Sequence, residues 1–250
     1  MPNSRQSLHA EHHPDAIKRR LAAPVQHSYL ADAVLGAIDG CVTTLAVVAG
    51  AVGARFSPTV AIILGLANLL ADGFSMAVSN YQSARTREDQ LKRVRRDEYE
   101  HIAHVPEGET EEIRQIFAAK GFSGDTLENI VTTITSDKKS WVDTMLVEEH
   151  GLALETPRPL LSALATFAAF IVVGLVPLAP FLIVSLSPSQ VFPTSVIFSM
   201  AAFFAVGALK GHVLDDRRLK HGTETMLAGS LAAMLAYFAG SVLRDMFGVS

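Results

Sequence analysis

Two carboxylates stand inside otherwise apolar stretches of this chain, where they could bind a cation. Asp39 lies well inside the first long hydrophobic run, and Asp72 lies mid-way along the second. If these runs cross a membrane, an ionisable group at that depth costs about 2.5–3.5 kcal/mol, so it normally faces a transport pathway or a partner. The alternative is a structural carboxylate capped by a neighbouring hydroxyl, such as that of Thr43 or Thr44. We predict a cation pathway.

The second hydrophobic run carries a polar stripe. Asn68, Asp72, Met76 and Asn80 recur every four residues, so on a helix they share one face. A thioether beside carboxylate and amide oxygens suits a borderline metal such as Fe²⁺ or Mn²⁺ better than Ca²⁺ or Mg²⁺. The alternative is that Met76 only packs and the polar groups bridge helices. We predict that Asp39, Asn68, Asp72 and Met76 line the pathway; the family resemblance described below implies that Asp39 and Met76 are its metal ligands.

A polar section, residues 85–158, separates the second and third hydrophobic runs and is dense in potential metal ligands. Carboxylates at three- and four-residue spacing on several short helices can converge on bound cations. A solvated acidic face is the alternative for any single cluster. The potential ligands fall in three clusters: Glu98, Glu100, His101 and His104; Glu107, Glu109, Glu111 and Glu112; and Met145, Glu148, Glu149 and His150. Of these we predict Glu98, Glu100, His101, Glu109, Glu112, Met145, Glu148 and Glu149 as metal ligands.

The elements that must position these residues follow from the distribution of charge. Hydrophobic residues make up 49% of the chain, and most charges fall outside five apolar runs. Each run is near the roughly 20 residues that a helix needs to cross a bilayer core, and lipid requires a helical backbone. The sequence therefore predicts an all-α, polytopic membrane protein with five transmembrane helices. The runs are Leu30–Ala54, Pro58–Ala84, Leu160–Leu186, Val191–Leu209 and Thr225–Leu243.

Prolines and helix caps refine these elements. Pro58 suits the start of the second helix, whereas Pro177 and Pro180 should kink or break the third. In the polar section we expect one helix to continue from the membrane through Glu88–His104, a second near Thr110–Lys120 with Thr110 as its N-cap, a third over Asp125–Ser136 and a fourth over Lys139–His150. We thus divide the chain into a polar tail (1–28), helices one and two (29–84), a cytosolic metal-binding domain (85–158) and helices three to five (159–250).

The flanking cations predict the orientation. Lys and Arg residues gather in the N-terminal tail, at 85–96 and at 210–220, and this places those parts in the cytosol and the C-terminus outside. We expect the bacterial inner membrane.

The net charge and the cysteine count limit the possible partners and metal sites. The net charge of −4 indicates no polyanionic partner, so we expect no nucleic acid, and the single Cys41 excludes a site of several thiolates. The tail histidines (His9, His12, His13 and His27) are solvated groups or, alternatively, a metal site.

These residues resemble the vacuolar iron transporter family from Ser28 to the C-terminus. The similar segments are the Asp39-Gly40 pair, the run 69–77, the glutamate-rich section, Trp141 to Leu152, and Ala208 to His212. The resemblance implies a homodimer with five transmembrane helices in each subunit, which exports Fe²⁺ and often Mn²⁺ in exchange for protons and holds no permanent cofactor. It implies pathway roles for Asp39 and Met76, and cytosolic metal binding by Glu98, Glu109, Glu112, Met145 and Glu149.

Three positions depart from the family pattern. Asn68 and His101 stand where glutamates are expected, and Leu146 stands where a second methionine is expected. Asp72, one turn from Asn68 on the same face, is a candidate substitute for the missing proton-coupling carboxylate.

Two other functions are consistent with parts of the sequence. Glu98-x-x-His101 is the Glu-x-x-His element of ferritin-like di-iron sites, so the polar section could be a ferroxidase, although those sites use two such elements. A membrane-anchored metal sensor or scaffold would account for the cytosolic ligands but not for Asp39 and Asp72. We therefore expect a transporter rather than an enzyme.

Overall fold

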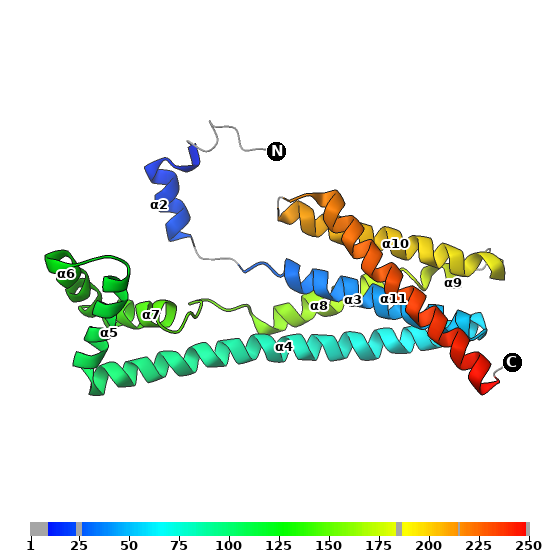
Figure 1. Cartoon of the computed structure of the whole chain (residues 1–250), viewed down its shortest axis with the longest axis horizontal. Coiled ribbons are helices and arrows are strands. Elements are labelled where there is room, and N and C mark those ends of the chain that lie inside the picture. The colour runs from blue at the N-terminus through cyan, green and yellow to red at the C-terminus, as the bar shows by residue number, and fades with distance from the viewer. Residues whose placement is uncertain (1–9, 24–26, 184–186, 215, 249–250) are drawn as a thin grey trace.

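The computed structural model describes residues 10–23, 27–183, 187–214 and 216–248, and these residues form helices and no strand (Figure 1). The all-α prediction is therefore confirmed. The helices are α2 (Pro14–Ala22), α3 (Leu30–Gly53), α4 (Pro58–His104), α5 (Pro106–Ala119), α6 (Gly124–Thr135), α7 (Lys138–Glu148), α8 (Pro159–Gly174), α9 (Ala179–Leu182), α10 (Pro188–Val213) and α11 (Arg218–Phe247). His9 of the N-terminal tail lies outside the described residues.

Among the described residues, four helices are long and apolar enough to cross a membrane: α3, α4, α10 and α11. These helices confirm a polytopic membrane protein. The third predicted span is divided, because α8 ends at Gly174, before Pro177, and the chain becomes helical again only in the four-residue α9, which contains Pro180. The predicted break is confirmed, whereas α8 alone is short for a span and the count of five remains a prediction. Residues 184–186 at the end of this run lie outside the described residues.

The longest element is α4, which runs for 47 residues, or roughly 70 Å, from the bundle into the polar section. The Ser57 hydroxyl accepts a hydrogen bond from the Val60 amide, and Pro58 occupies the first turn, where proline needs no amide partner. The helix ends at His104, just before Pro106, as predicted. Figure 1 shows α4 extending beyond the bundle to α5, α6 and α7. One rigid helix therefore joins the two parts of the molecule.

The bundle is built around α3, which packs against α4, α8, α10 and α11. Its contact with α8 is close because two glycines face the backbone of α8. A Cβ atom at Gly36 would lie 2.2 Å from the carbonyl oxygen of Thr166, and one at Gly40 would lie 2.4 Å from that of Phe170. Such distances exclude any side chain, so these small residues bring Asp39 on α3 close to its neighbouring helices.

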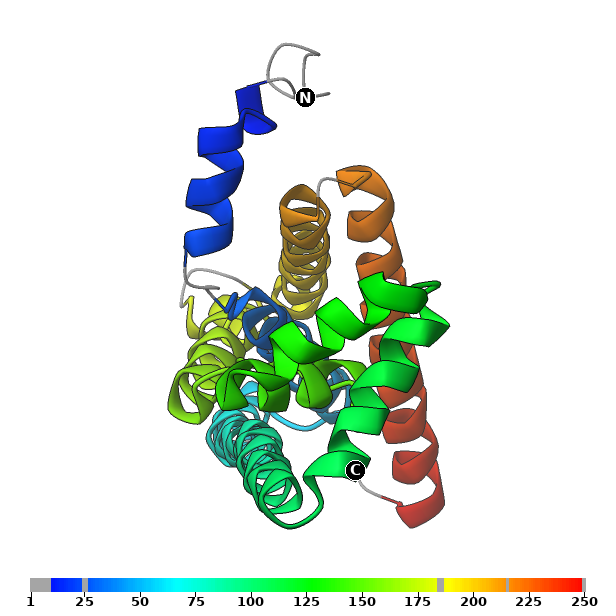
Figure 2. The same cartoon turned by 90° about the vertical axis from the view of Figure 1, so that its left-hand side faces the viewer.

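The polar section has an apolar core of its own. Leu91 and Ile102 from the distal half of α4 pack with residues of α5, α6 and α7, among them Ile113, Trp141 and Met145. Viewed from the left of Figure 1, these helices lie in front of the membrane bundle (Figure 2). This core gives the section the packing of a small helical domain, and its predicted bounds of 85–158 remain a prediction.

One predicted helix start is wrong. Thr110 is not an N-cap, because α5 already begins at Pro106, with Val105 in the capping position. The Thr110 hydroxyl instead donates to the Pro106 carbonyl oxygen, one turn back inside the helix (2.7 Å). The physical reason is that proline, with its fixed φ and missing N–H, favours the first position of a helix. The earlier start adds Glu109 to the first turns of α5.

Candidate metal site and membrane pathway

Glu98 is the centre of an acidic cluster where α4 meets α5 and α7. It lies on the same face of α4 as Leu91 and Ile102, which pack into the apolar core, so its side chain is carried inward and is only 2% exposed. His101 follows three residues later and therefore lies beside Glu98 on the helix surface. The helical repeat thus places a carboxylate and an imidazole at the entrance to the domain core.

Two further elements, α5 and the end of α7, bring their ligands to Glu98 and His101. The Oε1 atom of Glu98 lies 2.8 Å from Nε2 of His150, to which it is hydrogen-bonded, and 3.9 Å from Nδ1 of His101. Nδ1 of His101 also lies 3.5 Å from Oε1 of Glu109 on α5. Glu149, at the end of α7, places Oε2 3.5 Å from Nε2 of His150. Two groups of three potential ligands result, Glu98–His101–Glu109 and Glu98–Glu149–His150, and both contain Glu98.

Two carboxylate oxygens in this cluster are buried without a hydrogen-bond partner among the described residues, Oε2 of Glu98 and Oε2 of Glu109. An unsatisfied buried polar atom costs about 1–3 kcal/mol, and more when it is charged. Burial, and then the negative charges of Glu112 and Glu98, raise the pKa of Glu109 to about 7. Burial likewise raises the pKa of Glu149. A bound divalent cation would offset each of these costs.

The structure brings together only some of the predicted ligands. Glu98, His101, Glu109 and Glu149 converge, and the charge of the exposed Glu112 acts on both Glu109 and Glu149.

Two other predicted ligands lie outside these groups, and a third, Met145, stays a predicted ligand. Glu100 is exposed on another face of α4, and Glu148 forms an ion pair with Lys120. Met145 is fully buried in the apolar core of the domain. His150 was one of the potential ligands of the last helix in the sequence but was left out of the predicted set, and the structure brings it to Glu98.

The membrane carboxylate Asp39 lies half-buried on α3. The Thr43 hydroxyl donates to the backbone carbonyl oxygen of Asp39 (2.8 Å), and the Thr44 hydroxyl is buried without a partner, so neither hydroxyl caps the carboxylate. Within the described parts of the chain, the Asp39 carboxylate has no hydrogen bond. Asp72 on α4 is close enough for its charge to act on Asp39. This arrangement favours a cation pathway over a structural carboxylate.

The polar stripe of α4 divides into two parts. Asn80 bridges helices, with Nδ2 lying 2.9 Å from Oδ1 of Asp32 on α3 and 2.6 Å from Oγ1 of Thr166 on α8. The hydrogen bond between Asn80 and Asp32 was not predicted. Met76 packs against the apolar cluster around Leu69. Nearer the start of α4, the Nδ2 atom of Asn68 is buried without a partner in the described structure. Asn68 and Asp72 are therefore the part of the stripe that helix bridging does not explain.

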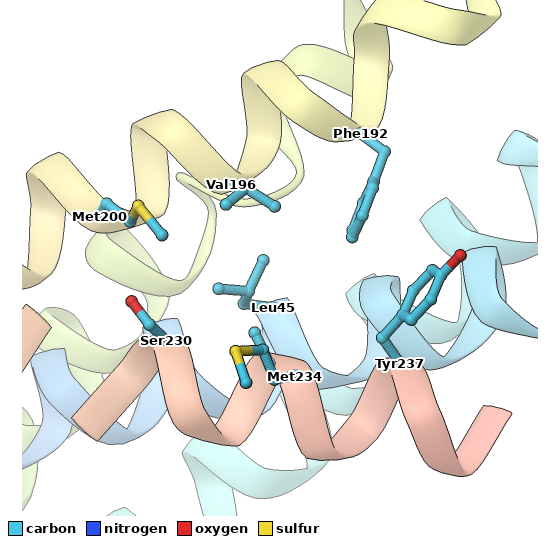
Figure 3. A pocket seen from close by; sticks show the side chains of 8 residues that line it. Leu45, Phe192, Val196, Met200, Ser230, Met234 and Tyr237 are labelled. Carbon is cyan, nitrogen blue, oxygen red and sulfur yellow. The ribbon is translucent and has the colours of Figure 1, made fainter. Parts of the chain in front are cut away.

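A separate groove of about 410 Å³ lies between α3, α10 and α11 (Figure 3). Phe192 and Tyr237 stack at one end, with ring centroids 6.0 Å apart. Met200 and Ser230 lie at the other end, and Met234 lies between Ser230 and Tyr237 (Figure 3). The lining contains no charged side chain, and its two hydroxyls are that of Tyr237 and that of Ser230, which donates to the Met226 carbonyl oxygen of its own helix. A groove of this kind offers no compensation for a divalent charge, so it is no alternative to the pathway predicted at Asp39 and Asp72.

Comparison with known proteins places the chain in a family. The model described as the VIT family matches residues 30–241, which include both the bundle and the acidic cluster. The chain belongs to the VIT family. Vacuolar iron transporter 1 of Arabidopsis thaliana is 29% identical over 85% of this chain and 85% of its own length. The vacuolar iron transporter of Toxoplasma gondii is 32% identical over 89% of this chain and 76% of its own length, and vacuolar iron transporter 2 of rice (Oryza sativa subsp. japonica) is 31% identical over 82% and 84%.

Membership of the VIT family confirms three predictions. The resemblance seen in the sequence is correct, the protein is an integral membrane protein, and it is a transporter rather than an enzyme. The matched segment contains every candidate ligand and pathway residue named above.

Proposed function

We propose that this VIT-family protein exports Fe²⁺ from the cytosol across a membrane in exchange for protons, with Mn²⁺ as a second cargo, and thereby limits metal excess. The observation that carries the proposal is the cluster around Glu98, which joins buried carboxylates to two imidazoles at one end of α4. The same helix carries Asp72 in the bundle. The printed names of the relatives, iron transporters, supply the choice of iron as cargo.

The mechanism begins with capture. The cluster raises the local concentration of Fe²⁺ beside the bundle, because its carboxylates are costly to ionise without a cation. The ion then passes to Asp39 and Asp72, whose like charges lie close together and are relieved by a divalent cation. Protons arriving from the opposite side neutralise these carboxylates and release the metal. Coupling of this kind requires groups whose charge changes with occupancy, and membrane carboxylates meet that requirement.

The exposed surface of α4 supports a homodimer. Ala67, Ala71, Ser75 and Ser79 form an exposed row of small residues directly beside the stripe of Asn68 and Asp72. In membranes, small residues spaced by four allow a second helix to approach closely. We propose that two copies meet along this row, so that Asp39 and Asp72 of both subunits line one pathway at the interface.

The orientation within the proposal follows from the cations. The N-terminus, residues 85–158 and the 210–224 loop face the cytosol, and the C-terminus lies outside. The membrane is the bacterial inner membrane. In this orientation the Glu98 cluster meets cytosolic metal, as export requires.

Transport by the purified protein in liposomes tests the proposal. With an acidic lumen, an internal metal-sensitive dye and ascorbate to keep iron reduced, we expect Fe²⁺ uptake that depends on the pH gradient. Asp39→Ala should abolish uptake, whereas Asp125→Asn, a change of an exposed carboxylate on α6, should leave it intact. Full uptake by Asp39→Ala would refute the pathway. No uptake of Fe²⁺ or Mn²⁺ by folded protein under any gradient would favour the sensor.

A further inference from the structure

His150 takes part in the cluster although it is distant in sequence and was absent from the expected ligands. Its Nε2 atom lies 2.8 Å from Oε1 of Glu98, 52 residues away, and 3.5 Å from Oε2 of Glu149. Its side chain is 31% exposed, whereas that of Glu98 is 3% exposed. The imidazole therefore covers a buried carboxylate from the solvent side.

The end of α7 fixes the position of His150. The His150 amide donates to the carbonyl oxygen of Met145, and the Leu152 amide donates to that of Leu146. Between them, Gly151 has a φ of +62°, in the left-handed region that favours glycine. This is a helix-terminating turn of the kind that satisfies the last carbonyls of a helix. Because Met145 and Leu146 are fully buried, the turn is anchored in the domain core and holds the imidazole toward Glu98.

An ion pair with Glu98 is the simplest role for His150, but it leaves part of the cluster unexplained. Even with the hydrogen bond to His150 in place, Oε2 of Glu98 is buried without a partner, and so is Oε2 of Glu109. Both side chains are more than nine-tenths buried. These unpartnered oxygens point to a cation, and any cation bound by Glu98 and Glu149 lies within reach of Nε2 of His150.

We infer that His150 is a direct metal ligand through Nε2 and that it sets the metal preference of the cluster, an inference that rests on the proposed function. Imidazole is a neutral ligand that suits iron, zinc and copper, whereas a site of carboxylates alone suits Mg²⁺, Ca²⁺ and Mn²⁺. His101 supplies a second imidazole on the other side of Glu98. With a nitrogen from each of two elements, the cluster favours Fe²⁺ over Mn²⁺ and over the abundant hard cations. Binding moves the Nε2 proton of His150 to solvent or to Nδ1, which frees the lone pair.

Metal competition on the full-length protein in detergent tests this preference. Co²⁺ serves as an air-stable probe for a nitrogen-preferring metal and Mn²⁺ as the probe for an oxygen-preferring one. His150→Ala should weaken Co²⁺ binding about 10- to 100-fold, the range seen when partners of metal ligands are removed, and should weaken Mn²⁺ binding far less. His150→Asp should restore Mn²⁺ affinity but not Co²⁺ affinity. His104→Ala, which removes an exposed histidine of α4 outside the cluster, is the matched control and should change neither.

A spectroscopic readout separates a ligand from a structural role. Pulsed EPR of Mn²⁺ bound to the His101→Ala variant should show coupling to an imidazole nitrogen, and the double variant His101→Ala/His150→Ala should lose it. The fluorescence of Trp141, the single tryptophan and part of the domain core, verifies that each variant is folded. Absence of nitrogen coupling in His101→Ala, or an equal loss of Co²⁺ and Mn²⁺ affinity in a folded His150→Ala protein, would overturn the inference.

Liposome transport distinguishes this inference from the proposed function. If wild-type protein transports Fe²⁺ and His150→Ala binds Co²⁺ and Mn²⁺ with unchanged preference, only the role of His150 fails. If wild-type protein transports neither metal and the preference still changes in His150→Ala, the transport proposal fails and the ligand assignment stands.

Discussion

At the scale of single residues, the chemistry of the cluster depends on Glu98. It is the member shared by both groups of potential ligands, and one of its oxygens is already bonded to His150 while the other has no partner in the described structure. A buried carboxylate in this position is unfavourable alone and favourable with a cation. Removing the charge of Glu98 should therefore weaken metal binding but should not destabilise the metal-free domain.

We expect Glu98→Gln to lower Co²⁺ affinity by about 100-fold while leaving the metal-free domain at least as stable as wild type. The amide keeps the shape of the side chain and an oxygen that accepts from His150, but it cannot neutralise a cation. Titration of Co²⁺ against Trp141 fluorescence measures the affinity, and thermal unfolding measures the stability. Glu100→Gln, on the exposed face of α4, is the control. Similar affinity losses in both variants would contradict a specific site.

The raised pKa of Glu109 predicts how binding depends on pH. With a pKa of about 7 in the folded, metal-free protein, this carboxyl holds a proton that the unfolded chain would lose near its ordinary value of 4.5. Between these values folding retains the proton, so metal-free stability should fall as the pH rises through the window. Metal binds the deprotonated form, so Co²⁺ affinity should rise over the same window and level off above about pH 7.

Isothermal titration calorimetry in buffers of different ionisation enthalpy would count the protons released on binding at pH 6.5. Glu109→Gln should release about one proton fewer than wild type, since one titrating carboxyl is gone. Glu111→Gln, a change of an exposed neighbour on the same helix, should release the wild-type number. An unchanged count in Glu109→Gln would show that Glu109 is already ionised before metal binds.

At the scale of elements, the α3–α8 contact decides where Asp39 lies. Gly36 and Gly40 allow the two backbones to touch, and Asn80 of α4 joins both helices through Asp32 and Thr166. Hydrogen bonds between membrane helices contribute about 0.6–2 kcal/mol each, so packing at the glycines sets the geometry and Asn80 reinforces it.

Gly40→Ala should therefore destabilise the bundle, because the new Cβ would lie 2.4 Å from the Phe170 carbonyl oxygen and force α8 away. Overpacking of this kind costs about 1–3 kcal/mol. Gly50→Ala is a control on the same helix, since its Cβ would meet only the Ala236 carbonyl oxygen at 3.6 Å. Thermal unfolding in detergent should show a lower midpoint for Gly40→Ala alone. Equal midpoints would mean that α3 and α8 pack less tightly than described.

At the scale of the whole molecule, α4 connects the acidic cluster around Glu98 to the bundle. Its distal half belongs to the core of the polar section, and its proximal half packs against α3 and α8 in the bundle. An unbroken helix between the two parts fixes the distance from Glu98 to Asp72, so the cluster stands at a constant place relative to the pathway (Figure 1). The proposed dimer would place two such helices side by side.

Cysteine cross-linking tests the dimer. The native Cys41 is fully buried, so an introduced cysteine should react alone. Ala71→Cys lies on the row of small residues and should form a disulfide-linked dimer under mild oxidation in membranes. Leu231→Cys, on an exposed face of α11, should remain monomeric on denaturing gels. A dimer through Leu231→Cys, with none through Ala71→Cys, would move the interface to α11.

The sequence by itself determined the features that depend on neighbours along the chain. Hydropathy located the apolar helices, prolines located the break after α8 and the end of α4, and helical spacing put Glu98 beside His101. The predicted start of α5 was wrong because Pro106 is a stronger signal for a helix start than Thr110. These features are local, so the residue pattern of one or two turns is sufficient to predict them.

Only the tertiary structure decided which of those residues meet. His150 reaches Glu98 across 52 residues, Asn80 reaches Asp32 across 48, and Met145 packs with Leu91 and Ile113 in the apolar core. Helical periodicity states which face a residue occupies but not which element that face will pack against. That choice depends on burying apolar area among distant segments, so the ligand set around Glu98 is a property of the packed domain.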